Sequence, residues 1–275
     1  MGLNQMKDSL INKKQNIFFF LGIFTILLVW FIWTLVDQNI FFPRIDEVII
    51  DIGKLLSEGK NLLIILYTFL KVIGLIIVAF IISFLFALLA YKFISFRSFI
   101  SPMIAIMRST PVASVILILI LLIGSKLAPI FISLLVIVPI AYENIYAAFI
   151  NVDKDLIDEA KLVSNINLKI IFSVFVPVSA NYLISTLLSC FGLALKVLVM
   201  SEVLTQGNMT IGGSIQIAKA TIDITRVFSW SIILVIIVLI VEFFIKKKKR
   251  VFSNRRWHIV TFIFMYYYDI ILKII

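Results

Sequence analysis

Apolar runs of about 20 residues recur along the whole chain, and they constrain the fold more than any other feature. A helix of about 20 residues is long enough to cross a hydrocarbon core of roughly 30 Å. Hydrophobic residues make up 62% of the 275 residues and charged residues only 15%, far from the composition of a soluble domain. The sequence therefore predicts an all-α integral membrane protein. Six core spans are expected, at residues 17–36, 62–91, 100–123, about 130–150, 181–203 and 227–245.

Prolines and charged residues set the expected limits of these spans. The second run is too long for one straight crossing, so Lys71 is expected to divide an interfacial leading segment from a crossing at residues 72–91. Pro111 lacks an amide donor and should kink the third helix or start a new one. Residues 124–129 should form a tight turn into the fourth run.

The segments between the spans are expected to be loops on the two membrane surfaces. Residues 37–60 and 204–226 are read as polar loops. Aromatic side chains near span ends are typical of the interfacial belt. The belt residues expected here are Trp30, Trp33 and Trp230.

The distribution of Lys and Arg predicts the orientation. With the amino end inside, the cytoplasmic segments hold 15 of these cations and the outer loops hold 6. The positive-inside rule then favours an even number of spans with both termini cytoplasmic. Seven cations crowd into residues 246–256, directly after the last run, which indicates a membrane-orienting anchor and no nucleic-acid partner.

The carboxyl-terminal residues 251–275 fit this scheme less well. Their apolar stretch is short and interrupted, while four side chains repeat at every fourth position and would line one helical face: Thr261, Met265, Asp269 and Lys273. A helix lying on the inner leaflet is favoured. A seventh span and an unstructured extension stay open as alternatives.

The sequence contains few of the residues that catalytic or metal sites require. The one cysteine, Cys190, lies in an apolar run and the one histidine, His258, lies near the end, which excludes a disulfide framework and a Cys/His metal cluster. No G-x-x-x-x-G-K-[ST] occurs, so a phosphate-cradling loop is missing. We expect no catalytic residue, metal site or cofactor, which disfavours a membrane-embedded enzyme.

A compact charged segment, residues 151–169, interrupts the apolar pattern on the cytoplasmic side. Residues 155–163 favour a helix with acids towards its start, where the helix dipole stabilises them. Ser164 and Asn165 then interrupt it, and Asn167 is a suitable N-cap for a second helix. The segment is predicted to be a cytoplasmic helix-elbow-helix, which suits docking to a soluble partner, although an ordinary solvated loop is the plain alternative.

This segment resembles the cytoplasmic loop of the permease subunits of binding-protein-dependent ABC importers. That loop carries Glu-Ala-Ala-x-x-x-Gly and a later Pro that opens the next span. Alignment on Pro177 places residues 158–160 on the triplet and Ser164 on the glycine, and a shift of one residue places residues 159–161 and Asn165 there. The family glycine is absent in either register, which leaves the geometry of the elbow open.

Further motifs are similar to the nitrate/sulfonate/taurine branch of that family. They are "YTFLKVIGL" at 67–75, "MRSTPVAS" at 107–114, "GLALKVLVMSEVL" at 192–204 and "IGGSIQIAKATIDITRVFS" at 211–229. Each is weak alone, but together they cover about residues 40–245 in the family's order.

The resemblance implies partners, a location and a coupling site. The partners are two cytoplasmic ATPase subunits, a second permease subunit that is either a copy or a paralogue, and an extracytoplasmic solute-binding protein. The location is the bacterial inner membrane. The residues implied in ATPase coupling are Asp155, Asp158, Glu159, Ala160, Ser164 and Asn165.

Four of the charged residues that lie within or beside the spans have expected roles. Arg108 is expected either at the inner end of a solute pathway, where it would attract an anion, or as a structural arginine near the interface. Glu202 is expected either in the pathway as a gating acid or in helix packing. Lys71 and Lys196 are expected to be interfacial or satisfied by a partner.

The sequence thus divides into an amino-terminal helix and outer loop (1–60), an ABC transporter transmembrane domain (61–245) and a basic anchor (246–275). The resemblance implies import of a small solute of the sulfonate, nitrate-like oxyanion or vitamin-precursor class. An ion-coupled secondary transporter is the alternative, which inverted repeats would favour.

Overall fold

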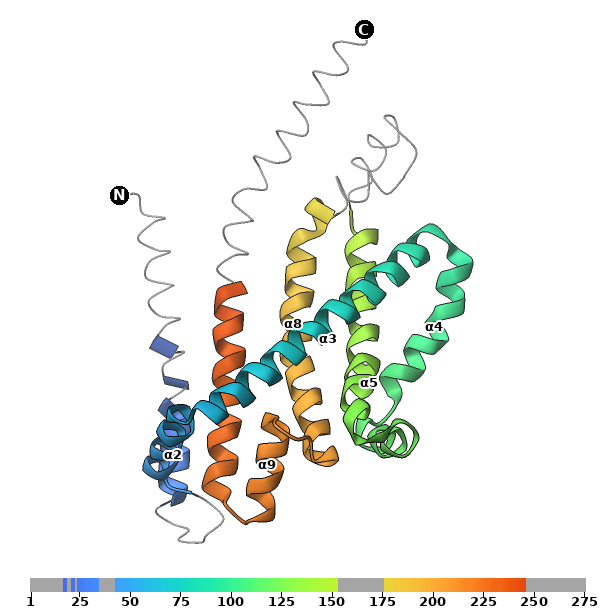
Figure 1. Ribbon diagram of the computed structural model, residues 1–275. Helices are drawn as coiled ribbons and strands as arrows, with labels where there is room; N and C mark the ends of the chain where they lie inside the picture. Colours follow the sequence, from blue (N-terminus) through green and yellow to red (C-terminus); the bar gives the residue numbers. More distant parts are fainter. Residues whose placement is uncertain (1–16, 19–20, 23, 35–42, 153–175, 246–275) are drawn as a thin grey trace, which may run out of the picture. The chain divides into compact units, whose positions relative to one another are not determined.

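Helices form all the regular structure in the part of the chain that the structure describes. The computed structural model describes residues 17–18, 21–22, 24–34, 43–152 and 176–245. The helices are α2 (Ile45–Ser57), α3 (Gly59–Lys92), α4 (Ile94–Ser109), α5 (Val112–Ile150), α8 (Val176–Thr205), α9 (Ile211–Ala220) and two unlabelled helices, Phe24–Thr34 and Ile224–Ile245 (Figure 1).

Four of these helices are long and apolar enough to cross a membrane: Gly59–Lys92, Val112–Ile150, Val178–Thr205 and Ile224–Ile245. The prediction of an all-α membrane protein is thereby confirmed. The count of six spans stays a prediction, since the first run lies partly outside the described residues and the third does not form a single helix.

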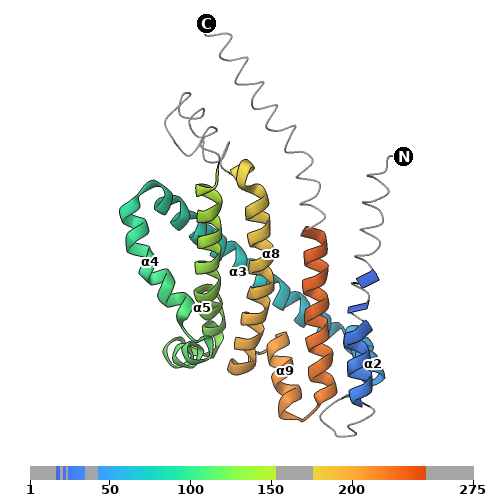
Figure 2. The same ribbon diagram turned by 180° about the vertical axis from the view of Figure 1, so that it is seen from behind.

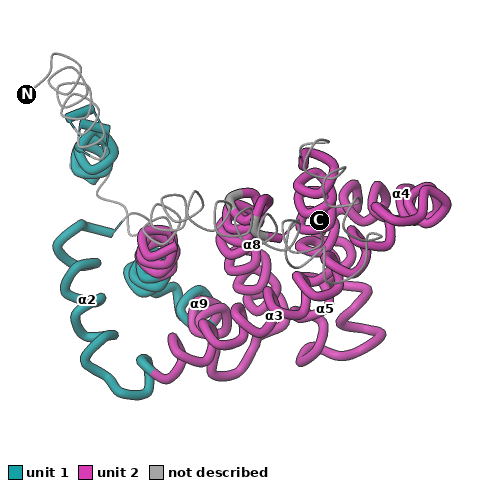
Figure 3. The backbone as a smooth tube through the Cα atoms, turned by 90° about the horizontal axis from the view of Figure 1, so that it is seen from above, with its two compact units in different colours: residues 1–62, 217–233 teal, residues 63–216, 234–275 magenta. Residues whose placement is uncertain are grey.

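Two compact units divide the chain (Figure 3). Unit 1 comprises residues 1–62 and 217–233. Within it, Asp51 of α2 pairs with Arg226 at 3.0 Å between Oδ1 and Nη2. The indole of Trp30 donates from Nε1 to the carbonyl of Pro43 at 3.2 Å. Polar contacts therefore join segments of unit 1 that are far apart in sequence.

Unit 2 comprises residues 63–216 and 234–275 and holds the larger core. The helices α5 and α8 lie side by side and run in opposite directions, and α3 crosses both obliquely (Figures 1 and 2). The Ser83 hydroxyl of α3 donates to the carbonyl of Val138 at 3.0 Å, and the Ser179 hydroxyl of α8 donates to the carbonyl of Ala148 at 3.0 Å. Small polar groups at helix contacts are a common way to join helices in lipid.

The helix α3 continues through Lys71, so the expected division of the second run is wrong. Its 34 residues measure about 51 Å at 1.5 Å per residue, which exceeds a hydrocarbon core of roughly 30 Å. Lys71 does not need to lie at a membrane surface, because its ammonium group pairs with a carboxylate inside unit 2, as described below. The helix can therefore continue through it. A helix of this length fits a bilayer by tilting and by extending beyond it.

Two segments predicted to be loops contain helices. Residues 45–57 form α2, in which Val48 and Leu55, seven positions apart, are both buried on one face. Acids in its first turn and a lysine in its last turn complement the helix dipole. Residues 211–220 form α9. The charged and polar residues of these segments predicted loops, whereas the helical spacing of their apolar residues indicates helices.

The predicted break at Pro111 is confirmed, whereas the tight turn predicted at residues 124–129 is confined to Gly124, and residues 125–129 are helical. The helix α4 ends at Ser109 and α5 begins at Val112, with Pro111 as its N-cap. Within α5, Gly124 has φ 81° and ψ 164°, a conformation that favours glycine. The piece before Gly124 packs back on the piece after it, where Ile116 is buried with Ala128 and Ile132.

Trp230 is not a belt aromatic, because the residue is only 2% exposed. Trp33 is 55% exposed, as a lipid-facing aromatic would be. Position near the end of an apolar run does not by itself reveal which face of the helix carries the ring.

Candidate functional site

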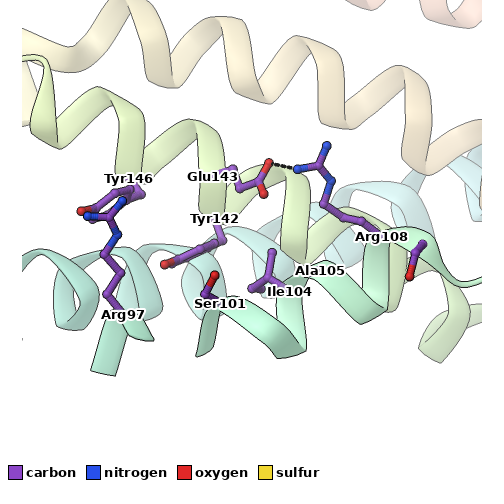
Figure 4. A pocket seen from close by; sticks show the side chains of 9 residues that line it. Arg97, Ser101, Ile104, Ala105, Arg108, Tyr142, Glu143 and Tyr146 are labelled. Atoms are coloured by element: carbon purple, nitrogen blue, oxygen red, sulfur yellow. Dashed lines mark hydrogen bonds and ion pairs between the residues drawn. The ribbon is translucent and has the colours of Figure 1, made fainter. Parts of the chain in front are cut away.

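A groove between α4 and α5 gathers several polar side chains around a cavity of about 530 Å³ (Figure 4). We call it the α4–α5 groove. Its lining residues are Arg97, Ser101, Ile104, Ala105, Arg108, Ser109, Tyr142, Glu143 and Tyr146.

The spacing of these residues explains the groove. Those from α4 recur at intervals of three, four and seven positions, so they share one face of the helix. The opposite side of α4 is apolar and exposed, with Phe99 at 66%, Met103 at 50% and Ile106 at 66%. The helix α4 is therefore amphipathic, and the buried Ile100 and Ile104 join it to the core beside this polar face.

An ion pair lies in the groove between α4 and α5. The Nη1 of Arg108 donates to Oε2 of Glu143, and the two side chains are 53% and 43% exposed (Figure 4). The guanidinium of Arg97 lies over the ring of Tyr146 at 4.9 Å, and that ring stacks on Tyr142 with centroids 6.0 Å apart. The groove thus offers both signs of charge beside two aromatic rings.

A second ion pair joins α3 to α8 and is buried. The Nζ of Lys71 lies 2.7 Å from Oε1 of Glu202, and the side chains are 21% and 1% exposed. Among the described atoms, Oε2 of Glu202 is buried without a hydrogen-bond partner. Lys71 also lies 5.3 Å from the ring centroid of Tyr67. Of the two readings expected for Lys71, interfacial or satisfied by a partner, the structure shows a partner, which is Glu202.

The turn that follows α8 packs tightly on Glu202. We call residues 202–213 the α8–α9 elbow. A Cβ at Gly212 would lie 2.4 Å from Cβ of Glu202, and one at Gly213 would lie 1.7 Å from the carbonyl oxygen of Gly207. The hydroxyl of Thr68 in α3 accepts a hydrogen bond from the amide of Ile211 at 3.1 Å. The helix α3 therefore holds the elbow at two points.

The residues predicted to be functional fall into three places. Arg108 lies in the α4–α5 groove and Glu202 lies beneath the elbow. The six residues implied in ATPase coupling lie outside the described residues: Asp155, Asp158, Glu159, Ala160, Ser164 and Asn165.

Glu143 was missed in the sequence, although a lone acid in an apolar run is a signal for a buried partner or a polar cavity. Tyr142 and Tyr146 carry no such signal. Among the described residues, no group of His, Cys, Asp or Glu is placed to hold a metal ion.

The chain was compared with known proteins. Residues 79–247 match the family described as "Binding-protein-dependent transport system inner membrane component". A chain of the MetNI methionine ABC transporter, solved in inward-facing conformations, is similar with a TM-score of 0.56 and 17% identity over 71% of this chain and 99% of that one. At that identity the likeness concerns the fold alone. The comparison with curated proteins finds no match. The matched segment covers more than half of the chain, which therefore belongs to the inner membrane components of binding-protein-dependent transport systems.

Proposed function

We propose that this permease component passes a small solute along the α4–α5 groove, driven by ATP hydrolysis in partner subunits. The observation that carries the proposal is that Arg97, Arg108 and Glu143 all line the groove between α4 and α5. Charged residues inside a membrane bundle face a water-filled cavity or a partner, because exposure to lipid is costly. A solute pathway along this polar face would account for these charged residues.

The proposed partners are two cytoplasmic ATPase subunits, a second permease subunit and an extracytoplasmic binding protein. The family supports the binding protein directly, by its description. The similar structure is an ABC transporter, which supports an ATPase partner. We place the chain in a bacterial inner membrane with both termini cytoplasmic.

The coupling of ATPase to pathway is proposed to run through residues 153–175, which connect α5 to α8. The ends of these helices are held together by the Ser179 to Ala148 hydrogen bond. The two helices then pack side by side along their lengths (Figure 2). A partner that binds the connecting residues would therefore move two packed helices, one of which carries Glu143.

The proposed solute carries an anionic group, in keeping with a sulfonate, a nitrate-like oxyanion or a vitamin precursor with such a group. Two arginines and one glutamate line the groove, so its charge is positive. Glu202 is proposed to act in packing, because it is 0% exposed and is paired with Lys71.

Co-purification tests the coupling. A tagged chain from its native membrane should bring down an ATPase, and Asp158→Arg plus Glu159→Arg should abolish that and solute uptake. Lys60→Glu plus Lys126→Glu is the control, since it reverses two exposed charges that are expected on the opposite side of the membrane. No ATPase with the unmodified chain, or retention after the first reversal, contradicts the proposal. Uptake that needs an ion gradient and no ATP would favour an ion-coupled transporter.

A further inference from the structure

The two ion pairs of unit 2 differ in how far their side chains are exposed. A buried pair serves packing, whereas an exposed pair is accessible to a solute that could replace one partner. Lys71 and Glu202 are 21% and 1% exposed, whereas Arg108 and Glu143 are 53% and 43% exposed. An exposed pair contributes little to stability, whereas removing one partner of a buried pair is strongly destabilising. A solute with suitable charges is therefore able to separate Arg108 from Glu143 at little cost.

The charges of the groove favour one kind of solute. A simple anion that binds Arg108 would displace Glu143 and leave that carboxylate beside an incoming negative charge, while Arg97 lies apart from the pair, over the ring of Tyr146 (Figure 4). A solute with an anionic group at one end and a cationic group at the other satisfies both residues at once. Glu143 therefore disfavours a simple anion by repulsion, and it favours a zwitterion by attracting the cationic group.

The remaining lining residues suit the body of such a solute. Ile104 and Ala105 supply an apolar wall, and Ser101 and Ser109 supply hydroxyl groups. The stacked rings of Tyr142 and Tyr146 offer a flat surface beside the charges. The volume of about 530 Å³ lies within the range of small-molecule sites, roughly 300–1,000 Å³.

We propose that the α4–α5 groove is a transient binding site for a small zwitterionic solute, whose anionic group takes the place of Glu143 at Arg108 while Glu143 holds its cationic group. This rests on the proposed function, and it narrows the solute from any small anion to one that also carries an ammonium or similar group.

Three probes of matched size test the charge requirement. Taurine and β-alanine are zwitterions, and isethionate has a hydroxyl in place of the ammonium of taurine. Binding to the full chain in lipid nanodiscs would be measured by saturation-transfer difference NMR, with empty nanodiscs as background. Both zwitterions should bind, and isethionate should bind at least tenfold more weakly.

Variants of the pair test the location. Arg108→Gln and Glu143→Gln should each weaken binding of taurine at least tenfold, and the charge swap R108E/E143R should restore it. Recovery in the swapped variant also shows that the protein folds. Lys126→Gln is the control, since it removes an exposed cation of α5 that does not line the groove, and it should leave binding unchanged.

Three outcomes would overturn the proposal. One is that isethionate binds as tightly as taurine, and another is that neither zwitterion binds. The third is that Lys126→Gln weakens taurine binding as much as Arg108→Gln and Glu143→Gln do. If the chain brings down its ATPase but binds neither zwitterion, the proposed function stands and only this inference fails. If no ATPase is brought down, the proposed function itself fails.

Discussion

Replacing Lys71 with methionine is the sharpest perturbation of the buried ion pair in unit 2. Methionine keeps much of the length and apolar volume of the lysine stem, so the change removes mainly the charge. Glu202 would then be left with its side chain 1% exposed and with Oε2 already lacking a hydrogen-bond partner among the described atoms. An uncompensated carboxylate would remain beneath the α8–α9 elbow.

The magnitude follows from that burial. Removing one member of a buried pair typically costs about 3–5 kcal/mol. At roughly 2–4 °C per kcal/mol for a chain of this size class, the midpoint of thermal unfolding should fall by about 6–20 °C. The double variant K71M/E202M should recover most of this loss, because replacing both charges by apolar groups of similar volume is often neutral or stabilising.

The assay is thermal unfolding of the purified full chain in detergent, arranged as a double-mutant cycle. Lys196→Met is the matched control, since Lys196 is an exposed cation on α8. A midpoint for K71M no lower than that of the Lys196 control would refute the reasoning. Strict additivity of the Lys71 and Glu202 substitutions would refute it as well.

Further predictions concern the backbone and unit 1. Gly213→Ala should destabilise the elbow by at least about 1–3 kcal/mol, since its Cβ would meet the carbonyl oxygen of Gly207 at 1.7 Å; a midpoint equal to that of the unmodified chain contradicts this packing. Gly124→Ala should cost about 1–3 kcal/mol through its backbone conformation alone, because nothing lies within 4 Å of the added methyl. Gly124→Asn should cost as much, since a ψ of 164° lies outside the left-handed helical region that Asn tolerates, and a midpoint of either variant equal to that of the unmodified chain would argue against backbone strain. Asp51→Asn should weaken the contact with Arg226 and lower stability by about 1–3 kcal/mol, measured by the same unfolding assay; no change would show that solvent already screens the pair.

Most of the helical framework could be predicted from the chain because its signals are local. Apolar runs of sufficient length predict spanning helices, and Pro111 and Gly124 interrupt them through their own backbone chemistry. The exceptions arose where charge masked helical spacing, as in α2, or where a charge was taken as a boundary, as at Lys71 in α3.

The candidate sites were less accessible to prediction. Arg108 and Glu202 each stand out as charges in apolar surroundings, yet neither partner follows from spacing along the chain. The acids of residues 153–169 stay a prediction drawn from the resemblance, since they lie outside the described residues.

Composition and the length of apolar runs are enough to place this chain in a membrane as a set of helices, because burial in lipid depends on each segment separately. The pairing of charges depends on which helix faces meet. Lys71 and Glu202 are 131 positions apart, and Arg108 and Glu143 are 35 apart, so their contacts exist only once α3, α4, α5 and α8 have packed. That packing also buries one pair and leaves the other exposed. The sequence alone does not distinguish the two pairs, because each consists of one basic and one acidic residue.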